Sequence, residues 1–367
     1  MSSSALSEPV VSLSPPDFPP EARLGLRDDP SFLLDDGRMR ELVRDLHRPN
    51  RAVYWADLLA CSLIGWVCFA GAVMLPPFSP AMLGCAVVAV FALYRALCFL
   101  HEVSHQNRRT LPGFETAWNL LVGYPLLMPS FVYVGVHQSH HRVTTYGTSQ
   151  DPEYMPFGRN SRMTVVFALE GFFIPAVQVI RFLALSPIGF LVPRFQRWLV
   201  IYLSSLTMNV RYRRELAPDL VSRVRRHSAA IWAAWAVAIG LAAAGMIPWR
   251  LFGIWFVVVA TVSFINTLRT LGAHAYESAG ETLDRVGQLV DSIDTPGGFW
   301  TELWAPVGLR YHALHHYFPG IPYHNLDKAY DRLISALQVG DHYGRMSSPG
   351  LRHSLLTLYK KGARRWN

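Results

Sequence analysis

Three short clusters of histidine are the part of this sequence best suited to chemistry. Two clusters place histidines at positions i, i+3 and i+4, and the other places two at i and i+4, so on a helix each cluster presents its imidazoles on one face. Neutral imidazole is the commonest metal ligand and suits zinc, copper, iron and nickel. Eight nitrogens exceed what one tetrahedral zinc ion can use, and they match two metal ions that each keep an open position. The clusters are His101 and His105; His137, His140 and His141; and His312, His315 and His316.

The composition is that of a membrane protein with polar ends. The 367 residues are 51% hydrophobic and only 16% charged, whereas soluble domains carry about 25% charged residues. The net charge of +8 is expected for basic residues on the cytoplasmic side of a membrane. No basic run is interleaved with stacking aromatic residues, which argues against nucleic-acid binding. The four cysteines form no CxxC motif, so we expect neither a disulfide framework nor a cysteine metal site.

The ends of the chain differ from its middle. Residues 1–36 are rich in serine and proline and show no leader pattern, so we expect a flexible cytosolic tail. Residues 37–340 form the membrane domain in this prediction, and residues 341–367 form a basic tail. The predicted fold class is all-α, with four transmembrane helices in two hairpins, interfacial helices and a cytoplasmic histidine-rich cap.

The first predicted hairpin leads directly into the first histidine cluster. Trp55–Leu75 and Ala81–Leu100 are each about 20 residues long, enough to cross the ~30 Å hydrocarbon core. The turn between them, residues 76–80, contains no lysine or arginine, while both open ends are basic. The positive-inside rule therefore predicts that the N-terminus, the histidines and the C-terminus are cytoplasmic.

The second predicted hairpin is Ala229–Ile247 followed by Leu251–Leu268, preceded by six arginines within residues 211–226. Met163–Thr207 is also apolar, but charged residues and prolines interrupt it, so we predict helices that lie in the membrane interface. His274 follows the last predicted span by about six residues, on the same side as His101. It is therefore a candidate ninth ligand.

Trp118–Val136 is 19 residues long without a charge, but we do not predict a crossing. A crossing would place His137 on the opposite side of the membrane from His101, where one metal centre could not use both. Prolines and glycines also interrupt the segment. We predict a kinked segment that dips into the membrane and returns.

The histidine motifs resemble those of the integral-membrane di-iron fatty acid desaturase and hydroxylase superfamily. His101–His105 reads HxxxH, and His137–His141 and His312–His316 both read HxxHH. The third cluster continues as HHYFPGIPYHNL, which is similar to the HHxFPxxPxxxL run of that family. The resemblance covers most of residues 50–340.

The resemblance implies that the eight clustered histidines bind two iron ions, with O2 as co-substrate. In some relatives a further histidine soon after the last span also binds metal, which matches His274. Several relatives have an asparagine one turn before it, where this chain has Thr270. Histidine ligands need acceptors that fix their tautomers, and three carboxylates are our candidates: Asp151, Asp327 and Glu102.

The implied reaction is O2-dependent desaturation of a long-chain fatty acyl group or related lipid. Hydroxylation or ketolation of a lipid or carotenoid on the same scaffold is the alternative, because the ligand set is similar for both outcomes. The chain contains no HPGG haem motif, and its third cluster begins with His312 rather than glutamine. By resemblance, electrons then come from a separate ferredoxin or cytochrome b5.

Two functions of other classes also fit parts of the sequence. His101–His105 reads HExxH, the zinc-protease signature in which Glu102 would be the general base. A protease would have no use for two HxxHH clusters, and it would lose all activity on replacement of Glu102 by glutamine. A metal carrier would place its ligands within the spans, whereas here they follow the span ends.

Overall fold

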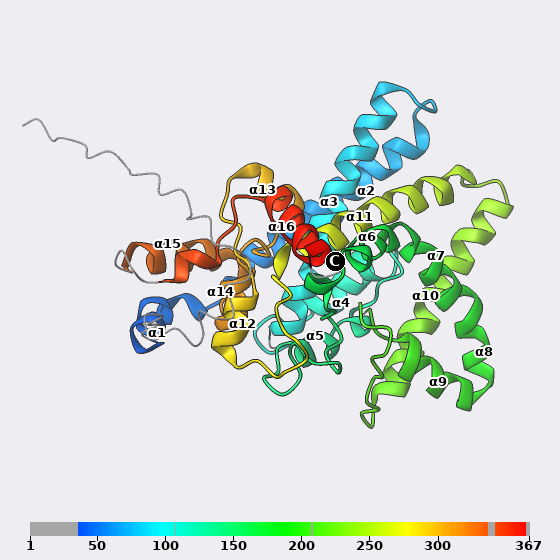
Figure 1. Ribbon diagram of the computed structural model, residues 1–367. Coiled ribbons are helices and arrows are strands. Elements are labelled where there is room, and N and C mark those ends of the chain that lie inside the picture. Colours follow the sequence, from blue (N-terminus) through cyan, green and yellow to red (C-terminus); the bar gives the residue numbers. More distant parts are fainter. Residues whose placement is uncertain (1–35, 107, 207, 337–341, 365–367) are drawn as a thin grey trace, which may run out of the picture.

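The computed structural model describes residues 36–106, 108–206, 208–336 and 342–364, and regular structure in these parts is helical (Figure 1). The predicted tail of residues 1–36 lies outside the described residues except for Asp36. The long helices are α2 (Arg51–Met74), α3 (Pro80–His105), α10 (Leu220–Ala243) and α11 (Arg250–Ala273). The shorter ones are α1 (Asp36–Val43), α4 (Phe114–Trp118), α5 (Val136–His140), α6 (Ser161–Glu170), α7 (Ile174–Val179), α8 (Ser186–Leu191), α9 (Pro193–Leu203), α12 (Arg285–Asp291), α13 (Phe299–Trp304), α14 (His312–Tyr317), α15 (Leu326–Ala336) and α16 (Leu351–Arg364).

Helices α2 and α3 form the predicted first hairpin, packed side by side along their length (Figure 1). Asn50 accepts hydrogen bonds from the first backbone N–H groups of α2, and Ser79 does the same for α3. The helices approach closely at Gly65, where an added Cβ would lie 2.7 Å from the Leu93 side chain. Arg95 of α3 binds both carboxylate oxygens of Asp57 on α2, at 2.8 and 2.6 Å. The hairpin thereby fixes the end of α3, which carries the first histidine cluster.

Four helical runs are long and apolar enough to cross a membrane, as predicted, but one of them is not the predicted one. Three runs correspond to α2, α3 and α11, and the fourth is Ser161–Leu191. The prolines of this run lie in the first turns of α7 and α8, where proline needs no backbone donor. Its Arg181 is buried and bonds to the Leu203 carbonyl and the Ser186 hydroxyl. We predicted interfacial helices in this stretch because of these interruptions, whereas by length and composition it is a candidate span.

Helix α10 covers most of the predicted span Ala229–Ile247, but its first two turns contain Arg223, Arg225 and Arg226. It does not meet the same criteria of length and composition. It also diverges from α11 rather than packing along it (Figure 1), and its main helical neighbours are α8, α9 and the π-helical turn Ile180–Leu185. Trp235 of α10 contacts Trp255 of α11 at a ring-centroid distance of 4.6 Å. The second predicted hairpin is therefore open.

The segment Trp118–Val136 enters the helix bundle and returns, in agreement with the prediction that it is not a crossing. The rings of His101 and His137 lie 4.8 Å apart, so both ends of the segment are on the same side. Its broken backbone is hydrogen-bonded by three indole N–H groups from other helices. Trp66 donates to the Leu121 carbonyl, Trp235 to that of Tyr124 and Trp255 to that of Pro125, at 2.7, 3.2 and 2.9 Å. Irregular backbone is tolerated at membrane depth only when it is buried in protein in this way.

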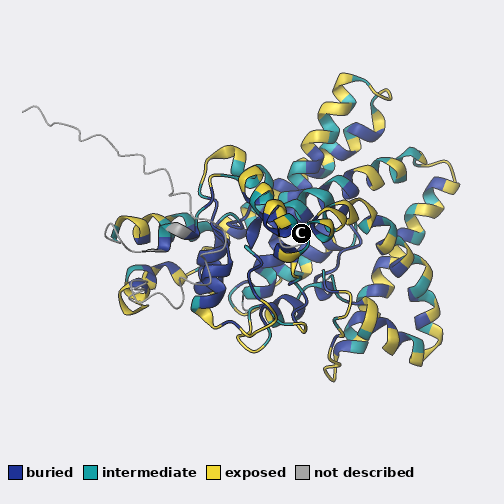
Figure 2. Ribbon diagram, in the orientation of Figure 1, coloured by how far each residue is buried: buried dark blue, intermediate teal, exposed yellow. Residues whose placement is uncertain are grey.

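The short helices form a cap over the histidine end of the bundle, and buried residues are concentrated there (Figure 2). A second apolar core joins α1, α12, α14 and α15 around Tyr311, Leu314 and Phe318. Helix α16 packs on α6 and α11. Its buried Lys361 forms an ion pair with buried Glu277, which follows α11.

Candidate metal centre

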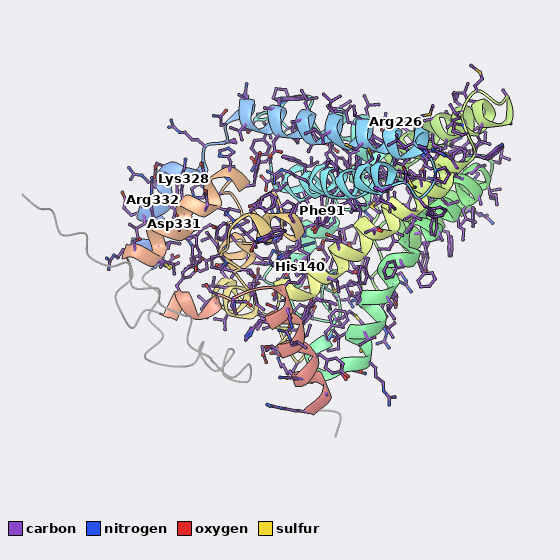
Figure 3. All side chains as sticks on the ribbon, turned by 90° about the horizontal axis from the view of Figure 1, so that it is seen from above. Phe91, His140, Arg226, Lys328, Asp331 and Arg332 are labelled. Carbon is purple, nitrogen blue, oxygen red and sulfur yellow. The ribbon has the colours of Figure 1, made fainter. Side chains whose placement is uncertain are left out.

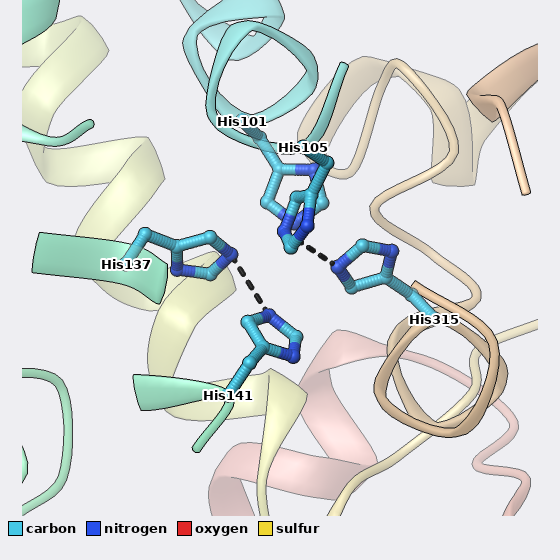
Figure 4. Close-up of side chains that lie close together, drawn as sticks. All are labelled: His101, His105, His137, His141 and His315. Carbon is cyan, nitrogen blue, oxygen red and sulfur yellow. Dashed lines mark hydrogen bonds between the residues drawn. The ribbon is translucent and has the colours of Figure 1, made fainter. Parts of the chain in front are cut away.

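All nine histidines predicted as ligands meet in the interior, in two groups. Within each group, one ring nitrogen of every member lies within 4.8 Å of the others. The first group is His101, His105, His137, His141 and His315, and the second is His140, His274, His312 and His316. Figure 4 shows the first group, with two rings from α3 facing His137, His141 and His315.

Each HxxHH motif divides its histidines between the two groups. In α5 and the residue after it, His137 and His141 join the first group while His140 joins the second. In α14, His315 joins the first group, while His312 and His316 join the second. Side chains one turn apart share a face, whereas neighbouring residues point about 100° apart. Two one-turn helices therefore serve both groups.

The Nε2 atoms of these rings converge on one another. His137 and His141 approach at 3.0 Å, as do His105 and His315 (Figure 4). His312 Nε2 lies 2.9 Å from that of His274 and 3.1 Å from that of His316. Lone pairs brought together in this way fit a shared cation, and neither ring nitrogen of buried His101 has a hydrogen-bond partner. The donor set therefore fits one metal ion in each group.

Burial favours the neutral form of most of these imidazoles, which is the form that binds metal. Removal from water lowers the pKa of His137, His274 and His312 well below the ordinary value of 6.5. Burial acts on His140 in the same direction, but the adjacent Asp151 carboxylate outweighs it and raises the pKa of this imidazole. Asp151 thus places a carboxylate in direct contact with the second group.

Asp151, a predicted partner, holds one ring of the second group. His140 Nδ1 donates to its two carboxylate oxygens at 2.9 and 3.0 Å, which leaves Nε2 free to face the group. Asp151 also accepts from the backbone N–H groups of Gly147 and Glu153, both at 2.9 Å. The loop after α5 is therefore folded around this carboxylate.

Glu153 holds His137 of the first group in a similar way. The distance from His137 Nδ1 to Glu153 Oε1 is 3.0 Å, and the Tyr133 hydroxyl lies 2.8 Å from the same nitrogen. Burial raises the pKa of Glu153 to about 7. Glu153 was not among the carboxylates predicted to orient a histidine, although its position two residues after Asp151 is consistent with this role.

Two further rings are oriented by partners that the spacing of residues did not indicate. His274 Nδ1 lies 2.9 Å from the Tyr146 hydroxyl, which donates in turn to Asp291 at 2.9 Å. His316 Nδ1 lies 3.3 Å from Oε1 of Gln288 on α12. These contacts join residues far apart in the sequence, so no local pattern could have revealed them.

The other two predicted carboxylates do not orient a histidine through a hydrogen bond. Asp327 lies in the first turn of α15, where its side chain accepts from the Lys328 backbone. Figure 3 shows His140 in the interior, whereas the labelled residues of α15 lie at the margin. Glu102 is buried behind the first group, where it accepts from the Tyr54 hydroxyl and the Tyr323 N–H. Both donors reach its Oε2, and its Oε1 lies 3.6 Å from His101 Nδ1, beyond hydrogen-bond distance.

A cavity of about 60 Å3 reaches His101 from between α3 and α11. Most of its lining is apolar, including Leu97, Met128 and Ile174. An apolar group in this cavity would therefore lie beside a histidine of the first group.

Comparisons with known proteins agree with this geometry. Residues 77–350, which include all nine histidines, match the model of the fatty acid desaturase family. The chain is also 39% identical over 327 residues to a ceramide hydroxylase of Caulobacter vibrioides (strain NA1000 / CB15N), covering 87% of this chain and 92% of that protein. The family match spans the segments that build the two histidine groups. The chain therefore belongs to the fatty acid desaturase family and is an integral-membrane, lipid-modifying oxidoreductase of the desaturase and hydroxylase type.

Proposed function

We propose that this chain hydroxylates a ceramide or a closely related lipid, using O2 and two iron ions held by the nine histidines. The observation that carries the proposal is the 39% identity over 92% of the length of a ceramide hydroxylase. The histidine groups supply the metal sites in this proposal, and the apolar cavity beside His101 supplies a path for the lipid chain. The proposal replaces our first choice from the sequence, desaturation, with its stated alternative.

The reaction inserts one atom of O2 into a C–H bond as a hydroxyl group and releases the other as water. Two electrons and two protons complete the balance and come from an external donor. Bound iron would supply the reduction of O2 needed to attack an unactivated C–H bond. The protein residues hold the rings neutral through burial, fix His137 and His140 through carboxylates, and exclude water from the lipid chain.

Desaturation remains the second candidate, because the family match names desaturases and the histidine set does not distinguish the two outcomes. Lipids of a host that makes the protein under 18O2 would separate them by mass spectrometry. Hydroxylation predicts a product that contains one 18O atom. A product that lacks two hydrogens and contains no 18O would overturn it in favour of desaturation.

A matched pair of variants connects the product to the metal centre. His315→Ala removes a nitrogen of the first group and should abolish the product. His353→Ala removes an exposed histidine of α16, outside both groups, and should leave the product unchanged. Iron analysis of purified wild-type protein should find about two ions per chain, and zinc alone in active protein would contradict the cofactor proposal.

We further propose that the histidine face is cytoplasmic and that a separate ferredoxin or cytochrome b5 docks on the basic stretch 211–226. Arg226 is exposed and available for steering an acidic carrier. Arg214 is not, since it is buried and donates to the carbonyls of Phe131, Ser204 and Val134. Arg226→Glu should slow turnover with a protein donor but not with a small chemical reductant. Equal rates with both donors would contradict the docking site.

A further inference from the structure

One face of α11 brings polar groups into the cavity beside His101. Ser263, Asn266 and Arg269 follow one another at intervals of three residues, and all three line this cavity. They face apolar side chains from other elements, such as Leu100 and Leu206. A hydrocarbon chain offers no hydrogen-bond partner to these three polar side chains.

Arg269 is the unusual member of this set. Its side chain is buried, with only 9% of the residue exposed. One guanidinium nitrogen donates to Asn266 Oδ1 at 3.1 Å and to the Thr270 hydroxyl at 3.0 Å, while Nε has no hydrogen-bond partner. Within the described part of the chain, no carboxylate lies within ion-pair distance of it, although the Glu153 carboxylate and the Tyr94 hydroxyl are near enough to interact with its charge. The buried hydroxyl of Ser263 also lacks a partner.

A buried guanidinium needs oxygen acceptors, because an uncompensated charge in an apolar site is strongly unfavourable. Arginine offers five N–H donors in a fixed fork, and here the neutral oxygens of Asn266 and Thr270 take up only part of that capacity. Arg269 also lines the cavity that reaches His101. The polar end of a lipid can supply the missing acceptors.

We propose that Arg269, with Ser263 and Asn266, binds an oxygen-bearing group of the substrate inside this cavity. Because the same cavity touches His101, the oxidised carbon then lies within a few bonds of that oxygen. The site thus selects a carbon near the polar end of the lipid rather than one in the middle of a long chain. This inference rests on the proposed function and names ceramide amide or hydroxyl oxygens as the bound group.

The test compares holoenzyme variants in steady-state kinetics and in product analysis. Arg269→Met keeps the length of the side chain and removes its charge and donors. We expect KM for ceramide to rise at least about tenfold, as for loss of a hydrogen bond to a charged group. We also expect the hydroxyl group to be spread over several carbons, which fragmentation of the product by mass spectrometry would locate. Iron content should stay at the wild-type value.

A second variant guards against misfolding of the first. Asn266→Asp places a carboxylate where Oδ1 now accepts from Arg269, so the arginine acquires an internal partner. This variant should accumulate normally and still bind ceramide weakly under anaerobic conditions. Arg269→Lys is a third variant, which keeps the charge but loses the planar fork of donors. Arg181→Lys, at another buried arginine whose side chain bonds to Leu203 and Ser186, is its matched control. We expect only Arg269→Lys to change KM and the position of the hydroxyl group.

The outcomes separate this inference from the proposed function. Wild-type oxidation at mid-chain would overturn the inference, as would an Arg269→Met or Asn266→Asp enzyme with wild-type KM and product position. A wild-type product that is desaturated near the polar end would overturn the hydroxylase proposal and support the inference. A free fatty acid and a sphingoid base should be tested beside ceramide, so that the oxidised carbon can be located even if ceramide is not the substrate.

Discussion

Asp151 and Glu153 lie two residues apart, and each orients a histidine of a different group. Asp151 binds His140 of the second group, and Glu153 binds His137 of the first. Alternate residues in this extended turn therefore point to different rings. The carboxylates fix which nitrogen of each imidazole is free, and that choice is a condition for metal binding.

Asp151→Asn should weaken metal binding without removing a ligand. The carboxylate of Asp151 accepts from His140 Nδ1 at both of its oxygens, and its negative charge polarises the ring. An asparagine amide has one acceptor oxygen and no charge. We expect metal affinity and activity to fall about 10–100-fold. Iron content measured across a chelator series would show it.

Asp327→Asn is the matched control, because its carboxylate accepts from the Lys328 backbone rather than from a histidine. It should bind iron as the wild type does. If both variants lose iron equally, the effect is not due to the contact with His140.

At the level of single residues, the nine candidate ligands could be predicted from the sequence, but most of the side chains that hydrogen-bond to them could not. The ligands belong to local motifs whose spacing already implies a shared face, and the structure brings all nine together. Asp327 and Asp151 were equally good candidates in sequence, since both follow a histidine cluster by about ten residues. Only the folded loop around Asp151 distinguishes them, as only packing brings Tyr146 to His274 and Gln288 to His316.

At the scale of elements, tryptophan side chains act as hydrogen-bond donors to a broken backbone. Each of three indoles from α2, α10 and α11 meets a carbonyl of the segment Trp118–Val136. In an apolar bundle these carbonyls have no access to bulk water. The indoles thus allow the segment to return His137 to the side from which α3 delivers His101.

Trp255→Phe should therefore destabilise the protein although it conserves an aromatic ring. The Pro125 carbonyl would lose the donor that now lies 2.9 Å away. An unsatisfied buried acceptor costs about 1–3 kcal/mol, and thermal unfolding in detergent would measure the loss. Trp300→Phe, at a residue that is 78% exposed, should change nothing. Equal stability of Trp255→Phe and wild type would show that the hydrogen bond is not needed.

The sequence predicted α2, α3, α11 and the returning segment because each follows from length and charge within one stretch. It did not anticipate Ser161–Leu191 as a candidate span, because the cost of an interrupting residue depends on the partners that the fold provides. Arg181 has a carbonyl and a hydroxyl as partners, and Gly171 allows the Phe264 backbone to approach, with 2.7 Å from an added Cβ to its Cα. These partners come from elements distant in sequence.

For the whole molecule, the buried pair Lys361 and Glu277 ties the C-terminal helix to the histidine cap. Lys361→Met should leave Glu277 as an uncompensated buried charge, at a cost of about 3–5 kcal/mol. Unfolding in denaturant should detect it, and the double variant with Glu277→Gln should recover part of the loss. If the double variant is no more stable than Lys361→Met, the two side chains are not coupled.

Metal removal should also affect the whole molecule. The two groups gather residues from α3, α5, α14 and the end of α11, which are otherwise joined by short cap elements. Since metal binds the folded chain in preference to the unfolded one, its loss lowers stability. We expect chelated protein to unfold at a lower temperature and iron to restore the wild-type value. A melting temperature that does not depend on iron would contradict metal binding at these groups.

Because each HxxHH motif is divided between the two groups, the geometry of a single helical turn sets the spacing between the groups. His140 and His141 are neighbours in the chain, yet they belong to different groups, as do His315 and His316. The separation of two bound ions would follow from the angle between successive residues on a helix, about 100°. A residue inserted between either pair would rotate one partner past its ion. Substitutions elsewhere in the cap can change the shape of the substrate path, but these four positions fix the separation of the two ions.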